Sequence, residues 1–181
     1  MRYFTGLLIA IGLIILIFVI ILKGGGGVKP QSVNLNSYAN SDSSIQLTID
    51  GPINANQTHQ QVQVDISPTN TGIEMLQGYQ GMVTASKTYL NNQTAYNVFL
   101  HALSLAGFTK GTSSTNLDSE TAACSTGERY ILTLTNSGNT VAEYWSTSCG
   151  GGTYGGDING TLALFEEQIP DFDTITENFI Y

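Results

Sequence analysis

The chain has 181 residues and a net charge of -8, with six Lys and Arg residues against fourteen Asp and Glu residues. This acidic balance argues against nucleic acid as a partner, because most of the surface would repel a phosphate backbone. Charged residues make up only 11% of the chain, and Thr, Ser, Asn, Gln and Gly supply much of the rest, a composition common in exported proteins.

An apolar run without a charge occupies residues 3–22. At about 1.5 Å of rise per residue, a helix over this run reaches roughly 30 Å, the thickness of the hydrocarbon core of a bilayer. A cleaved signal peptide is the first alternative, but no Ala-x-Ala site ends the run. A pilin precursor is the second, but that family has a glutamate where this chain has Ile11. We therefore predict an uncleaved transmembrane anchor over residues 1–23.

Residues 24–43 combine four glycines, Pro30 and a run of Ser, Asn and Gln, which predicts a flexible tether. The positive charges that flank the anchor are nearly balanced, so they do not fix its orientation. Cys124 and Cys149 form an even count, which indicates a disulfide outside the cytosol. We expect a single-pass protein of the cell membrane, with residues 44–181 folded as one extracytoplasmic domain.

Alternation of apolar and polar residues predicts strands over residues 45–49 and 62–66. Less regular runs predict two further strands, over 73–77 and 82–89. His59 falls in the polar loop between the first two strands, and we expect it to be solvated.

An apolar stripe at helical spacing predicts a helix over residues 92–106, with Asn91 or Asn92 as its cap and Gly107 after its end. His101 lies on the polar face of this helix and is expected to face water. A final helix is predicted from about Gly160 to Gln168, capped by Asp157 or Asn159.

The sequence Asn-Ser-Gly-Asn at 136–139 separates two β-rich runs, 129–136 and 140–147, and predicts a hairpin. With Ser137 and Gly138 as the loop, Tyr130 lies opposite Trp145. In that register the two cysteines miss direct opposition by two positions, so the prediction needs a bend at Gly127 or in the glycine run 150–152. We predict that a disulfide between Cys124 and Cys149 closes the open end of this hairpin.

Together these elements predict an α+β fold. The N-terminal transmembrane helix is followed by a small antiparallel sheet of about five to six strands, packed with two helices.

No stretch shows a local Ser-His-Asp or Cys-His signature, so no catalytic residue and no cofactor is assigned. Two carboxylate pairs, Glu166 with Glu167 and Asp171 with Asp173, leave a surface hydrolase as an alternative. Neighbouring helix residues point about 100° apart, so we expect these carboxylates to be solvated.

A calcium site is a weaker prediction. Its candidate ligands are Asp157, Asn159, Asp171, Asp173 and Glu177. The glycine at 160 comes too early for an EF-hand loop, so we expect no metal.

The C-terminal half is acidic and aromatic. From Asp118 onward, ten acidic residues face Arg129 as the one basic residue. Four aromatic residues gather around the predicted hairpin, and such side chains are common at recognition surfaces. The predicted contact surface consists of Tyr130, Tyr144, Trp145 and Tyr154.

The stretches GYQGMVTASKTYLNNQTAYNVFLHALSLAGFTKG, CSTGERYILTL and EYWSTSCGGGT resemble a loose group of uncharacterised single-anchor extracytoplasmic proteins of bacteria with reduced genomes. The resemblance covers most of residues 44–175. It implies an extracytoplasmic α+β domain on one anchor, and it implies no activity or site residues.

We therefore expect a membrane-tethered, non-enzymatic module of the bacterial cell envelope that binds a surface or envelope protein or glycan. A surface hydrolase and a divalent-cation-dependent adhesion module are the alternatives.

Overall fold

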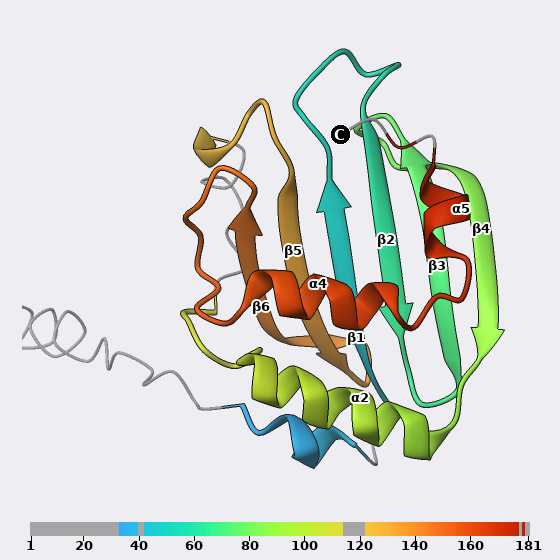
Figure 1. The fold of residues 1–181 in the computed structure, drawn as a ribbon, viewed down its shortest axis with the longest axis vertical. Helices are drawn as coiled ribbons and strands as arrows, with labels where there is room; N and C mark the ends of the chain where they lie inside the picture. The colour runs from blue at the N-terminus through green and yellow to red at the C-terminus, as the bar shows by residue number, and fades with distance from the viewer. Residues whose placement is uncertain (1–32, 40–41, 114–121, 178, 180–181) are drawn as a thin grey trace, which may run out of the picture. The chain divides into compact units, whose positions relative to one another are not determined.

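The computed structural model describes residues 33–39, 42–113, 122–177 and 179. In this part of the chain, six strands form one antiparallel sheet that is packed with three α-helices (Figure 1). The strands are β1 (Ser43–Asp50), β2 (Gln60–Ile66), β3 (Asn70–Gln77), β4 (Met82–Leu90), β5 (Arg129–Asn136) and β6 (Asn139–Thr147). The helices are the 3-10 helix η1 (Leu35–Tyr38) and the α-helices α2 (Gln93–Ala106), α4 (Ile158–Glu166) and α5 (Phe172–Thr176). The α+β class and all six strands were predicted correctly, and α5 is one helix more than expected.

The strand order is β4-β3-β2-β1-β5-β6, with every neighbouring pair antiparallel. The first four strands form a meander that runs from β1 to one edge of the sheet. The chain then passes through α2 and pairs β5 with the free side of β1. As a result, β1 lies inside the sheet between strands from the two halves of the chain.

One face of the sheet carries the core. The β1 residues Ile45, Leu47 and Ile49 are at most 5% exposed and belong to one apolar cluster. Helices α2, α4 and α5 lie over this face (Figure 1). Their buried contributions are Tyr96, Phe99, Leu100 and Leu103 from α2, Phe165 from α4 and Phe172 from α5.

Because side chains alternate along a strand, the residues between the core positions point to the other side of the sheet. We call this side the open face. Its members include Ser44, Gln46, Thr48, Gln63, Asp65, Glu74, Thr133, Thr135 and Glu143. Ile131, opposite Thr48, and Trp145, opposite Ile131, also lie on this side. The alternation predicted from the sequence therefore separates an apolar side from a mostly polar side.

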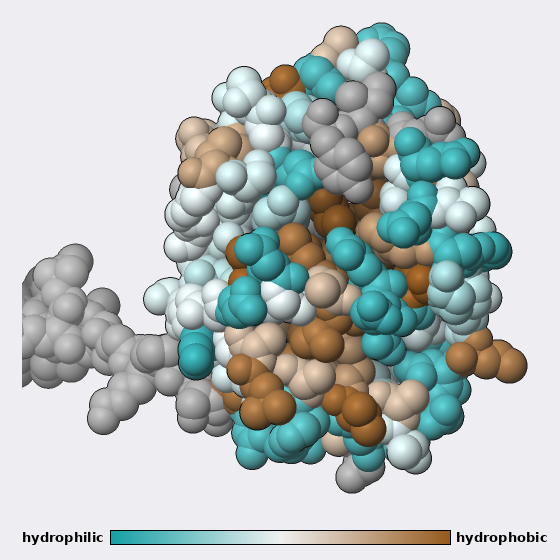
Figure 2. Space-filling model, in the orientation of Figure 1, coloured by the Kyte–Doolittle hydropathy of each residue, from teal (hydrophilic) through white to brown (hydrophobic). Residues whose placement is uncertain are grey.

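Both ends of α2 have the predicted capping. The Asn92 side chain accepts a hydrogen bond from the Ala95 amide at 3.0 Å. At the other end Gly107 has a φ of 87°, and the Phe108 amide donates to the Leu103 carbonyl, which is a Schellman ending. His101 is exposed, as predicted. Figure 2 shows apolar side chains on the outer surface over α2.

The folded domain begins earlier than predicted. Leu35 of η1 is 1% exposed and joins the core cluster, and η1 packs against α2. The predicted tether over 24–43 is therefore wrong for residues 33–39, because one large apolar side chain in this polar run finds a site on α2. Residues 24–32 of the tether and the anchor predicted over 1–23 lie outside the described residues. Within the described ranges, no helix is both long enough and apolar enough to cross a membrane.

The register of the β5-β6 hairpin also differs from the prediction. Ser137 and Gly138 form the loop, with φ angles of 50° and 77°. A bulge between Leu134 and Thr135 then shifts the pairing by one residue. Trp145 therefore lies opposite Ile131, and the predicted pairing of Trp145 with Tyr130 is wrong.

Replacing Leu35 with alanine tests whether η1 is part of the folded domain. We expect Leu35→Ala to lower the free energy of unfolding by about 2–5 kcal/mol, the usual cost of emptying a fully buried leucine site. The measurement is urea denaturation of the full-length chain. The matched control is Leu105→Ala, which truncates an α2 leucine that is 75% exposed and should have little effect. Equal stability of Leu35→Ala and the wild-type chain would contradict the packing of η1.

Candidate functional site

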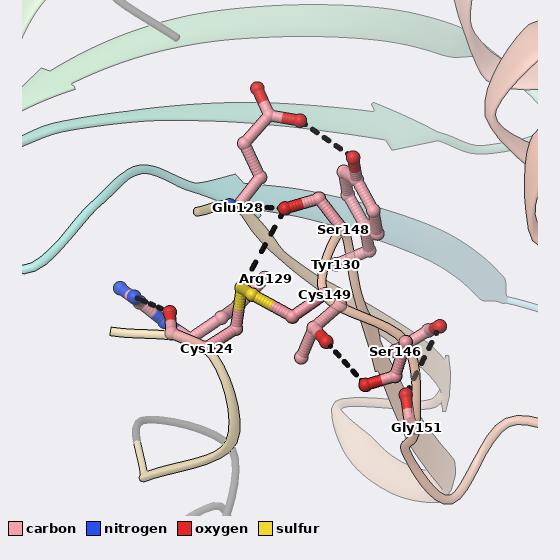
Figure 3. Close-up of a disulfide and its surroundings, with 10 residues drawn as sticks. Cys124, Glu128, Arg129, Tyr130, Ser146, Ser148, Cys149 and Gly151 are labelled. Carbon is pink, nitrogen blue, oxygen red and sulfur yellow. Dashed lines mark hydrogen bonds between the residues drawn. A yellow bond between two sulfur atoms is a disulfide. The ribbon is translucent and has the colours of Figure 1, made fainter. Parts of the chain in front are cut away.

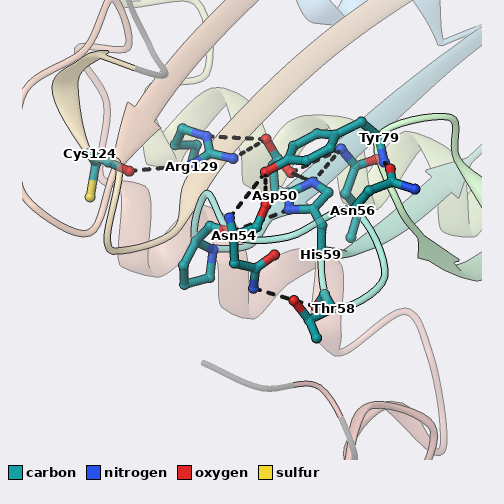
Figure 4. Close-up of polar contacts among 10 residues, drawn as sticks. Asp50, Asn54, Asn56, Thr58, His59, Tyr79, Cys124 and Arg129 are labelled. Carbon is teal, nitrogen blue, oxygen red and sulfur yellow. Dashed lines mark hydrogen bonds and ion pairs between the residues drawn. The ribbon is translucent and has the colours of Figure 1, made fainter.

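A cluster of polar side chains is buried at one end of the sheet (Figure 4). At its centre is Asp50, the last residue of β1, which faces Arg129, the first residue of β5. The guanidinium of Arg129 donates to Asp50 Oδ2 from both Nε and Nη2. The other carboxylate oxygen, Oδ1, lies 2.9 Å from His59 Nε2 and accepts a 2.9 Å bond from Gln61 Nε2. We call these four residues the Asp50 cluster.

The His59 ring is fixed from three sides. Its Nδ1 lies 3.2 Å from the Pro52 carbonyl oxygen, and the Tyr79 ring stacks on it with centroids 4.0 Å apart. The Tyr79 hydroxyl donates to the Asn54 carbonyl, and its amide donates to the Asn56 side chain. Tyr79 therefore holds the β1-β2 loop over the cluster.

The Asp50 cluster is saturated. Four side-chain nitrogens, two of Arg129 and one each of His59 and Gln61, surround the Asp50 carboxylate, which has about four acceptor sites, so no site remains for a substrate. His59 is 0% exposed and Arg129 is 1% exposed. The prediction that His59 is solvated is wrong, because the stacked Tyr79 and the β1-β2 loop cover it. We assign the cluster to stability.

The predicted disulfide joins Cys124 and Cys149, with their Cα atoms 5.7 Å apart (Figure 3). Glycines occupy both of the positions that were expected, as alternatives, to permit the bend, Gly127 and the run 150–152. A Cβ atom on Gly127 would lie 2.7 Å from the Cys124 sulfur, so only glycine fits there. Gly150, Gly151 and Gly152 all have positive φ angles, which other residues rarely adopt.

The disulfide is connected to the Asp50 cluster. Arg129 Nη1 donates to the Cys124 carbonyl at 3.3 Å. On the opposite side of the bridge, the Ser148 hydroxyl lies 3.6 Å from the Cys124 sulfur and accepts a bond from the Glu128 amide. The covalent link therefore positions the loop that covers Arg129.

A cavity of about 600 Å³ lies where β1 begins and β2 ends. Ser44, Asp65 and Thr135 line it from the open face, and the Ser44 and Thr135 hydroxyls are 3.0 Å apart. We call this cavity the Asp65 pocket. Its lining consists of Asp42, Ser43, Ser44, Asp65, Ser67, Pro68, Thr69, Gln93, Thr135 and Gly138. Burial raises the pKa of Asp65, a bond from Ser44 lowers it, and the charge of Glu74 raises it.

A second cavity, of about 390 Å³, lies between α4 and α5 and holds both predicted carboxylate pairs, Glu166 with Glu167 and Asp171 with Asp173. The pKa of Glu166 is raised by burial, and then by the negative charges of Asp173, Glu128 and Glu167. The pKa of Asp171 is lowered, first by a hydrogen bond from Lys87 and then by one from Tyr89. The pKa values of Glu166 and Asp171 are therefore shifted in opposite directions.

The four aromatic residues of the predicted contact surface do not share an exposed surface. Tyr144 is 3% exposed in the core, and Trp145 is 6% exposed on the other side of the sheet. Tyr154 contacts Tyr144 edge-on, and the Tyr130 hydroxyl donates to Glu128. The bulge in the hairpin is the reason, because it turns Tyr130 and Trp145 to opposite sides.

The candidate calcium ligands have different roles in the structure. Asp157 caps α4 by accepting a bond from the Gly160 amide, as predicted for the helix start. Asp171 is occupied by Lys87 and Tyr89. Of the other candidates, Asn159 lies within α4, Asp173 lies within α5, and Glu177 follows α5. Within the described residues, no group of three or more His, Cys, Asp or Glu side chains could hold a metal ion.

Removing the charge at the centre of the Asp50 cluster should destabilise the domain strongly. We expect Asp50→Asn to lower the free energy of unfolding by about 3–5 kcal/mol, because it leaves the buried Arg129 without a counter-charge. The measurement is chemical denaturation of the full-length chain. The control, Glu167→Gln, neutralises an exposed carboxylate and should change stability by less than about 0.5 kcal/mol. If Asp50→Asn and Glu167→Gln both lower the free energy of unfolding by the same small amount, the Asp50 cluster does not stabilise the domain.

The raised pKa of Glu166 predicts a pH-dependent change in stability. The folded chain binds this proton more tightly than the unfolded chain, so stability falls as the pH rises through the raised pKa. We expect Glu166→Gln to have a higher melting temperature than the wild-type chain at pH 7. The difference should vanish below the ordinary glutamate pKa of 4.5, where both states are protonated. Glu177→Gln, which removes a carboxylate that does not line this cavity, is the control, and a lower melting temperature for Glu166→Gln at pH 7 would refute the prediction.

We also compared the chain with known proteins. No protein-family model matches it, and no curated protein matches it. No residue role can therefore be assigned from a relative, and the geometry of the open face and its pocket is the remaining guide to function.

Proposed function

We propose that the chain is an extracytoplasmic binding module of the cell envelope that recognises its partner with the open face. One observation carries this proposal: helices α2, α4 and α5 lie over one side of the sheet, and the other side presents mostly polar side chains, beside Ile131 and Trp145, with the Asp65 pocket at its end. A cavity of about 600 Å³ falls within the range of roughly 300–1,000 Å³ typical of small-molecule sites.

The chemistry of the open face suits recognition. Its amides and hydroxyls both donate and accept hydrogen bonds, and its carboxylates accept them. The polar side chains of the open face lie on strands whose other side packs in the core, so their positions are well fixed. The buried Asp50 cluster at the other end of the sheet keeps the strand ends together and takes no part in binding.

The Cys124–Cys149 disulfide supports a location outside the cytosol, because such bonds persist in oxidising compartments. The apolar run at the N-terminus would hold the domain at the membrane in this proposal. The expected partner is a surface or envelope protein or glycan.

Site-specific photo-crosslinking tests the proposal. A photoreactive amino acid replaces Gln63 on the open face of the full-length chain in its native cells, and a second variant carries it at His101, exposed on α2. We expect crosslinks to an envelope component from position 63 and none from position 101. Crosslinks of equal yield from both positions, or none from position 63, would reject the open face as the binding surface.

A surface hydrolase remains the second candidate, and one observation favours it. Glu166 has a raised pKa and Asp171 a lowered pKa beside the same cavity, and enzymes use carboxylates with pKa values that differ in this way as acid and base. Release of soluble saccharide from cell-wall glycan by the full-length chain, lost in Glu166→Gln, would rank this function first.

A further inference from the structure

The lining of the Asp65 pocket is suited to a ligand with several hydroxyl groups. Five of its ten residues are Ser or Thr, and Gln93 adds an amide. Hydroxyl and amide groups can each donate and accept, so they can match ligand hydroxyls in either role. The Ser44 and Thr135 hydroxyls are within hydrogen-bond distance of each other, 3.0 Å apart, and either can be the donor.

The charge of the pocket is entirely negative. Asp42 and Asp65 line it, and none of the ten lining residues is Lys, Arg or His. Glu74, on the next strand, adds to the negative potential at Asp65. A ligand with a positive charge would therefore be attracted, and an anionic ligand would be repelled.

Asp65 supplies the most specific part of the site. Its side chain is half-buried, and burial opposes the ionised form of the carboxylate. An ionised carboxylate only accepts hydrogen bonds, whereas an ammonium group offers three donors and a positive charge. A ligand ammonium at Asp65 would supply the counter-charge that the lining lacks.

We infer that the Asp65 pocket binds an amino sugar, a ligand that carries a primary ammonium group beside hydroxyl groups. This inference rests on the proposed binding function and names the chemistry of its ligand. The ammonium pairs with Asp65, and the hydroxyls bond to Ser44, Thr69, Thr135 and Gln93. The hydroxyls of Ser43 and Ser67 are already bonded within the protein, to Tyr38 and Tyr96 and to Asn70. The unit belongs to an envelope glycan that contains hexosamines without N-acetyl groups.

Titration of the full-length chain in detergent with two trisaccharides tests the inference. The first is β-1,4-linked glucosamine trisaccharide, and the second is its N-acetylated form, which has the same shape of backbone but no ammonium group. We expect calorimetry to show binding of the first and roughly tenfold to a hundredfold weaker binding of the second, the usual effect of losing a charge-assisted hydrogen bond.

Two variants and one control locate the site. Asp65→Asn should weaken binding of the glucosamine trisaccharide by the same roughly tenfold to hundredfold factor, since it removes the partner of the ammonium. Gln93→Ala, at an exposed position on α2, should weaken it severalfold, and it serves if Asp65→Asn fails to fold. Glu177→Gln removes an exposed carboxylate that lies outside both the open face and the pocket lining, and it should leave binding unchanged.

Three outcomes would overturn the inference: equal binding of the two trisaccharides, no binding of either, or binding that neither Asp65→Asn nor Gln93→Ala weakens. Saturable binding of CaCl2 alone that Asp65→Asn abolishes would also overturn it, because the pocket would then be a cation site. In each case crosslinking from position 63 reports separately on the proposed function. If those crosslinks persist, only the ligand class is wrong, and if they are also absent, the binding function itself is refuted.

Discussion

The buried carboxylate of Asp50 joins parts of the chain that are far apart in the sequence. It binds the Arg129 guanidinium at the start of β5, and His59 and Gln61 at the start of β2. Three strands therefore meet at one acidic group, which is the counter-charge of the buried Arg129. The disulfide and the stacked Tyr79 close the same region from the two sides. The buried polar groups of the Asp50 cluster therefore hold strand ends together at one end of the sheet.

Most of the secondary structure could be predicted from the sequence because its signals are local. Alternation within a strand, the Asn92 cap and the Gly107 ending each depend on a few consecutive residues, and all of them are present in the structure. The disulfide was also predictable, since the cysteines flank one hairpin and glycines on both sides permit the bend. The start of the domain was missed because Leu35 is a single apolar residue in a polar segment, too weak a pattern to indicate packing.

The candidate sites depend on pairings between distant segments, and these could not be derived from local patterns. In the sequence, His59 lies in a polar loop and nothing nearby indicates burial. In the structure, the pairing of β1 with β5 brings Arg129 beside Asp50, and His59 is buried against this pair. A single bulge was enough to turn Trp145 away from Tyr130 and to remove the expected aromatic surface. The Asp65 pocket likewise forms from segments that become neighbours only in the folded sheet. Its one sequence signal was a charged residue at a polar position of an alternating strand.

The central position of β1 has a consequence for how this domain can change. Ser44 at one end of the strand belongs to the pocket, and Asp50 at the other end anchors the buried cluster. They are six positions apart along an extended strand, a distance of about 20 Å at 3.3–3.4 Å per position. Substitutions at sites so far apart are usually additive in their effects on stability. The side chains around the pocket can therefore be changed without loosening the buried cluster that holds the strand ends.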